Sequence, residues 1–140
     1  MYKILIVDDT HAWCEFHKTN IEEMFLEKGV KDYSIDVAPY ARIGLDRLYE
    51  NTSSPYDLIV TDLQMEEDFA PKYAGEWLVE QSKNLPSYKN TKIVISSGCY
   101  NIKNIAEFLG VDCIPKRIAC TDINTYKDLI SKLLKLGEVK

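Results

Sequence analysis

The stretch that decides the fold covers residues 56–65 and reads Tyr-Asp-Leu-Ile-Val-Thr-Asp-Leu-Gln-Met. Its apolar run, Leu58 to Val60, is too short for a helix and comes shortly after Pro55. A run of this kind is typical of a strand buried on both faces in the middle of a parallel sheet. In open α/β sheets, ligands bind outside the carboxyl ends of the strands. Asp62, which follows this run, therefore stands where a functional carboxylate is expected.

The rest of the chain alternates short apolar runs with amphipathic segments, and this alternation predicts the fold class. The expected strands are 4–7, 33–38, 58–60, 92–98 and 111–115, and the expected helices are 11–28, 40–50, 75–85, 102–109 and a last one from 122. Such an order predicts an α/β fold, in which a parallel sheet is covered by helices on both faces. Residues 66–73 show neither period, and we expect a mobile, exposed loop placed to gate access to Asp62.

The composition indicates one globular domain, residues 1–140, with 46% apolar and 28% charged residues. The net charge of −5 gives no general attraction to nucleic acid or to an anionic membrane. The four cysteines form no C-x-x-C pair, which favours reduced thiols in a cytosolic protein. The first apolar run, residues 4–7, is too short for a signal peptide or a membrane span. We therefore expect a cytoplasmic protein without nucleic acid or membrane partners.

Polar side chains follow four of the expected strands. Asp8 and Asp9 follow the first strand, Asp62 the third, Ser96 or Ser97 the fourth and Lys116 the fifth. Because the carboxyl ends of parallel strands share one edge, these groups are expected to converge. Mg²⁺ relieves the repulsion between crowded carboxylates and takes oxygen ligands. A carboxylate can also act as a nucleophile and form an aspartyl phosphate, which asks for positive charge around the transferred group.

The sequence resembles the receiver domain of two-component response regulators over essentially its whole length. The resemblance is carried by Ile4-Leu-Ile-Val-Asp-Asp9, by residues 56–65, by Ser97-Gly98 and by Lys116. It implies a flavodoxin-like (βα)5 doubly wound sheet with strand order 2-1-3-4-5. It also implies a signalling switch rather than an enzyme, phosphorylated by a histidine kinase or a phosphotransfer protein.

The resemblance also implies a role for each site residue. Asp62 would accept the phosphoryl group. Asp8 and Asp9 would hold Mg²⁺ together with Asp62 and the backbone carbonyl of Gln64. Ser97, rather than Ser96, would contact the phosphoryl group, because a small residue follows that hydroxyl in the family. Lys116 would pair with the phosphate.

The sequence departs from the family pattern at three places. Arg117 follows Lys116 where the family has a proline in a cis peptide bond, so we expect a rebuilt loop there. Glu66 follows Met65 in place of proline, and Gly75 stands 13 positions (75 − 62) after the acceptor, farther than usual. Cys113 occupies the place of the switching aromatic residue. We therefore expect the signal to leave through the loop after Ser97 and the helix over 101–109.

Each of these residues also has a plainer interpretation. Asp8 and Asp9 could be a helix N-terminal acid pair, Ser97 a turn residue and Lys116 a solvated loop lysine. His11 is interpreted as an exposed first-turn residue rather than a metal ligand. The aromatic side of the first helix, with Trp13, Phe16 and Met24, is interpreted as core.

Two other functions remain open from the sequence. A degenerate receiver would act as an interaction scaffold without phosphorylation. A stand-alone Mg²⁺-dependent phosphatase would turn over an aspartyl phosphate, but such enzymes commonly carry an acid at the position of Gln64. The output partner is expected to be another protein or an output domain missing from this chain.

Overall fold

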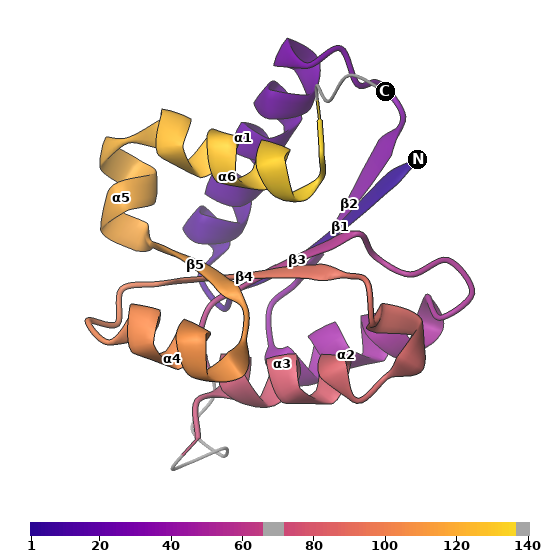
Figure 1. Cartoon of the computed structure of the whole chain (residues 1–140), viewed down its shortest axis with the longest axis vertical. Coiled ribbons are helices and arrows are strands. Elements are labelled where there is room, and N and C mark those ends of the chain that lie inside the picture. The colour runs from indigo at the N-terminus through magenta and orange to yellow at the C-terminus, as the bar shows by residue number, and fades with distance from the viewer. Residues whose placement is uncertain (66–71, 137–140) are drawn as a thin grey trace.

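The computed structural model describes residues 1–65 and 72–136 of the chain. Its five strands form one parallel sheet in the order β2-β1-β3-β4-β5 (Figure 1). The strands are β1 (Tyr2–Val7), β2 (Tyr33–Ala38), β3 (Leu58–Thr61), β4 (Lys92–Ser97) and β5 (Asp112–Pro115). The predicted flavodoxin-like sheet and its strand order are confirmed.

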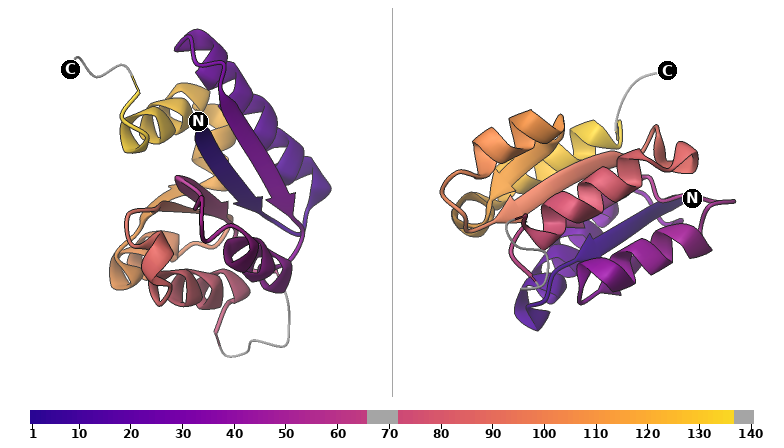
Figure 2. Two further views of the ribbon diagram at one scale, coloured as in Figure 1. Left: turned by 90° about the vertical axis from the view of Figure 1, so that its right-hand side faces the viewer. Right: turned by 90° about the horizontal axis from the view of Figure 1, so that it is seen from below.

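The helices connect successive strands. They are α1 (His11–Glu27), α2 (Ala41–Glu50), α3 (Ala74–Lys83), a 3-10 turn η2 (Pro86–Tyr88), α4 (Ile102–Leu109), α5 (Lys116–Thr121) and α6 (Ile123–Leu133). Figure 1 shows α2, α3 and α4 on one face of the sheet and α1, α5 and α6 on the other. The turned view in the left panel of Figure 2 shows the same division.

Alternating side chains of the central strands supply the two cores. On β1, Leu5 and Val7 are fully buried under α2 and α3, whereas Ile4 and Ile6 are fully buried under α1 and α6. A strand with no exposed face places apolar residues at consecutive positions, which explains the unbroken runs in the sequence. The edge strand β2 is only half-buried over Tyr33–Asp36, as its mixed sequence predicts.

Helix α5 differs from the sequence-based expectation. A rebuilt loop was expected after the fifth strand, but the chain enters a helix at Lys116 directly after Pro115. The residue before a proline is pushed out of the helical region of backbone space. Because Arg117 rather than a proline follows Lys116, this restriction is absent, and Lys116 is the first residue of α5.

The strand register brings the ends of β1 and β3 to the same level. Val7 is paired with Thr61, so Asp8 and Asp62 leave the sheet side by side, and the backbone N–H of Asp62 donates to the carbonyl of Val7 at 2.9 Å. Ser97 is paired with Pro115, so the end of β4 lies next to Lys116. Most of the predicted loop 66–73 lies outside the described residues; Lys72 at its end is exposed and forms an ion pair with Glu80 at 2.7 Å.

Candidate functional site

Three carboxylates meet at the carboxyl edge of the sheet. One oxygen each from Asp8, Asp9 and Asp62 lies within 4.8 Å of the others. Asp8 and Asp62 are buried, with 1% and 7% of their surface exposed, whereas Asp9 is exposed at the start of the β1–α1 loop. The helix-cap interpretation of Asp8 and Asp9 does not account for a third acid at the same place.

Lys116 joins two of these acids. Its Nζ lies 3.0 Å from Asp8 Oδ2 and 3.0 Å from Asp62 Oδ2, and it donates a hydrogen bond to the latter. Its side chain is 14% exposed, so it is not a solvated loop lysine. Lys116, the first residue of α5, therefore supplies the positive charge that was predicted at this edge of the sheet.

The pKa values of Asp8 and Lys116 are shifted by burial and by neighbouring charges. Burial raises the pKa of the Asp8 carboxyl, the Thr10 N–H opposes this rise, and the Asp62 carboxylate adds to it. Burial disfavours the ammonium of Lys116, but Asp62 and Asp8 outweigh burial and raise the pKa of Lys116. The ammonium therefore stays charged between two acids, which lowers their mutual repulsion.

The oxygens of the cluster fit a hard cation. Asp8 Oδ1 accepts a hydrogen bond from the Thr10 N–H at 2.9 Å, but Asp8 Oδ2 is buried and has no hydrogen-bond partner among the described residues. Asp8 Oδ2 lies 3.0 Å from Lys116 Nζ, and this ion pair compensates the charge of Asp8. Three carboxylates at one edge offer the oxygen ligands that Mg²⁺ prefers. Gln64 follows on the same loop with an exposed side chain.

The backbone of Asp62 is fixed by the start of α3. Asp62 Oδ1 accepts the Leu63 N–H at 2.7 Å, and the Gly75 N–H donates to the carbonyl of Leu63 at 2.9 Å. A Cβ at Gly75 would lie 1.9 Å from the carbonyl oxygen of Asp62. Only glycine permits this approach, so Gly75 sets the position of the Asp62 backbone. The sequence indicated this residue only as a glycine after the acid.

The two serines at the end of β4 differ in their surroundings. Ser97 Oγ accepts the Cys99 N–H at 3.2 Å and lines a hollow of about 350 Å³ together with Arg117. Ser96 Oγ is buried and has no hydrogen-bond partner among the described residues. Ser97 is thus the serine that ends β4 and contacts the loop after it, and its contact with a phosphoryl group stays a prediction.

The first turn of α1 borders the acids on their other side. His11 is exposed, as expected, but it lines a hollow of about 330 Å³ with Asp8, Asp9 and Cys14. Cys14 Sγ donates to the carbonyl of Asp8 at 3.2 Å, and burial together with the charge of Asp8 raises the pKa of this thiol to about 11. Cys14 is therefore a protonated structural contact of the Asp8 backbone.

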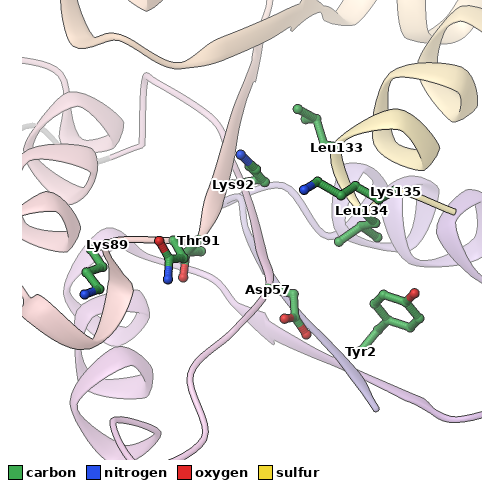
Figure 3. Close-up of a pocket in the computed structure, with 9 residues that line it drawn as sticks. Tyr2, Asp57, Lys89, Thr91, Lys92, Leu133, Leu134 and Lys135 are labelled. Atoms are coloured by element: carbon green, nitrogen blue, oxygen red, sulfur yellow. The ribbon is translucent and has the colours of Figure 1, made fainter. Parts of the chain in front are cut away.

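The pocket in Figure 3 lies away from this edge. It has a volume of about 390 Å³ and is lined by Tyr2, Asp57, Lys92 and Leu134, among others. Tyr2 and Lys92 begin their strands and Asp57 precedes one, so the pocket lies at the amino edge of the sheet. It is separate from the carboxylate cluster.

Comparisons with known proteins bear on the fold. The chain superimposes on a response regulator from Chloroflexus aurantiacus with a TM-score of 0.73 at 18% identity, covering 96% of this chain and 98% of that one. The chemotaxis response regulator CheY4 of Vibrio cholerae gives 0.68 at 18% identity, with 95% and 98% covered. The Mn²⁺-bound form of the response regulator Rcp1 gives 0.69 at 20% identity, with 100% and 98% covered. No family model and no curated protein matches the sequence.

These similarities define the class of fold. The chain has the fold of response regulator receiver domains along nearly its whole length. The described residues include no helix long and apolar enough to cross a membrane.

Proposed function

We propose that the protein is a phospho-accepting receiver domain of a two-component system in the cytoplasm. The observation that carries this proposal is the contact of Lys116 Nζ with both Asp8 and Asp62, 3.0 Å from each, beside the exposed Asp9. A buried strand pair has no packing need for three acids and a lysine at one edge. Phosphoryl transfer to a carboxylate needs this combination of charges.

The chemistry assigns one step to Asp62. A carboxylate oxygen of Asp62 attacks the phosphorus of a phosphohistidine on the kinase or phosphotransfer partner. The new O–P bond forms as the P–N bond breaks, and the electron pair of the P–N bond returns to the imidazole of the partner. Lys116 and the Ser97 hydroxyl would contact the oxygens of the transferred group. Asp8, Asp9, Asp62 and the Gln64 carbonyl would hold Mg²⁺, which would supply further positive charge when bound.

The output follows from the added charge. A phosphoryl group on Asp62 introduces negative charge and acceptor oxygens beside Lys116 and Ser97. These two residues begin α5 and end β4, so their movement reaches the β4–α4 loop and the α5 helix. A downstream protein or an attached output domain would read this change. The protein is then a switch that undergoes phosphorylation rather than an enzyme that turns over a separate substrate.

The experiment is incubation with acetyl phosphate and Mg²⁺ followed by intact mass spectrometry. We expect the mass of one phosphoryl group to appear in the wild type and not in Asp62→Asn. Asp57→Asn is the matched control, because Asp57 is an exposed acid at the other end of the same strand, bonded to the Lys3 N–H at 2.8 Å. Its phosphorylation should equal that of the wild type. An unmodified wild type would favour a scaffold that acts without phosphorylation.

A further inference from the structure

A third contact of the Lys116 ammonium lies outside the acidic cluster. Its Nζ lies 4.8 Å from the centre of the Trp13 ring, on the first turns of α1. A cation over the face of an indole is attracted by the ring quadrupole, and the attraction grows where water is excluded. The sequence assigned Trp13 to the core, but its ring covers the charged end of the site lysine.

The Trp13 ring packs against His17, which forms a buried hydrogen-bonded pair with Tyr126. Trp13 packs against Phe16 at 4.9 Å and against His17 at 5.7 Å between ring centres. His17 is 1% exposed, and its Nδ1 lies 2.7 Å from the hydroxyl of Tyr126, a fully buried residue of α6. Phe16 also contacts Tyr126 at 5.8 Å. The hydrogen bond between α1 and α6 therefore fixes the ring that faces Lys116.

This arrangement matters because the other two contacts change during the proposed reaction. Asp8 and Asp62 would share their oxygens with a cation, and the Asp62 carboxylate would become an acyl phosphate. A lysine side chain has several rotatable bonds, and its ordering is costly without a fixed contact. Of the three groups that contact the ammonium, the Trp13 ring is the one whose charge distribution does not change during the proposed reaction.

We propose that Trp13 is a positioning residue, which holds the Lys116 ammonium beside Asp62 for phosphoryl transfer, and that the His17–Tyr126 pair holds the Trp13 ring. This inference rests on the proposed function. It assigns the aromatic side of α1 a role in the reaction as well as in packing.

The test compares two substitutions in phosphorylation by acetyl phosphate. Trp13→Leu removes the ring face and should slow phosphorylation of Asp62 about fivefold, whereas Trp13→Phe keeps a weaker ring and should restore much of the rate. In a Lys116→Met background, Trp13→Leu should have no further effect, because the lysine it positions is gone. Phe25→Leu is the matched control, since Phe25 is a buried α1 aromatic that stacks on Tyr33 at the other end of the helix.

A second readout needs no phosphorylation. The ring should shift the side-chain NMR resonances of Lys116 upfield in the wild type and in Phe25→Leu, and this shift should disappear in Trp13→Leu. An unshifted Lys116 in the wild type, or an equal slowing by Trp13→Leu with and without Lys116, would overturn the inference. A phosphorylated wild type with an unchanged rate in Trp13→Leu would overturn the positioning role alone. A wild type that is not phosphorylated would overturn the proposed function and the positioning role together.

Discussion

Lys116 Nζ lies 3.0 Å from Asp62 Oδ2, although 54 positions separate the two residues in the sequence. The same atom lies 3.0 Å from Asp8 Oδ2. The ammonium thus compensates the charge of two buried acids. Under the proposed function, the Lys116 ammonium would already be in place when negative charge is added at Asp62.

Removing this ammonium should expose the repulsion between the acids. Breaking a buried ion pair from one side leaves an uncompensated charge, so Lys116→Met should lower the free energy of unfolding by about 3 kcal/mol without Mg²⁺. Saturating Mg²⁺ should recover part of the loss, because the cation binds the folded state. Urea denaturation with and without Mg²⁺ measures both effects. Equal stability of the variant and the wild type without Mg²⁺ would contradict this account.

Asp9 should contribute most to cation affinity. Asp8 Oδ1 is engaged by Thr10 and Asp8 Oδ2 faces Lys116, whereas Asp9 is exposed beside both acids. Asp9→Ala should weaken Mg²⁺ binding at least about tenfold, as loss of a ligand does. Titration followed by tryptophan fluorescence measures this, with Asp46→Ala as an exposed acidic control on α2. Unchanged affinity in Asp9→Ala would exclude Asp9 as a ligand.

Gly75 should not tolerate a side chain. The added Cβ would lie 1.9 Å from the Asp62 carbonyl oxygen, so α3 or the backbone of Asp62 must move. Overpacking of this kind costs about 3 kcal/mol, and Gly75→Ala should also slow phosphorylation of Asp62. Gly98→Ala is the matched control, because a Cβ there meets nothing within 4 Å. If chemical denaturation shows equal stability of both variants, the close approach at Gly75 is wrong.

The stability of the protein should fall in mild acid because of His17. Burial, and then the charge of Lys116, lower the pKa of His17 from 6.5 to about 3. Its ring also contacts the Tyr126 hydroxyl and the three aromatic rings of Trp13, Phe16 and Tyr126. His17 is therefore protonated below pH 6.5 in the unfolded chain, but only below about pH 3 in the folded protein. Stability is full above pH 6.5 and is lost toward lower pH, by about 1.4 kcal/mol per pH unit.

The measurement is urea denaturation of the wild type and of His17→Gln at pH 7.5 and pH 5.5. Between pH 7.5 and pH 5.5 the free energy of unfolding of the variant should fall by about 1 kcal/mol less than that of the wild type. The raised pKa of Asp8 acts in the opposite direction, but it is common to both proteins. Parallel pH profiles would show that His17 is protonated in the folded state.

The phosphorylation signal should leave through Ser97 rather than through position 113. Cys113 is half-buried, and its side chain is too small to swing as an aromatic switch does. Ser97→Ala should abolish most of the phosphorylation-dependent change in amide exchange over residues 97–109, and Cys113→Ala should leave it nearly intact. Changes confined to α1 and α2 would contradict this route.

The sequence determined the sheet and the composition of its carboxyl edge. Unbroken apolar runs such as 4–7 and 58–60 can be satisfied only by strands buried on both faces. Once such strands are parallel, the residues after them share an edge. The convergence of Asp8, Asp9, Asp62 and Lys116 therefore follows from pattern and topology alone.

The tertiary structure decided what surrounds these residues. Periodicity assigned Trp13 to the packed side of α1, but it carried no information on the ammonium that would lie over its ring. Spacing marked Gly75, but not the carbonyl that excludes a Cβ there. The helix Lys116–Thr121 is too short to show a period. These features depend on how helices are rotated and how closely they approach the sheet, and that is set by packing between segments distant in sequence.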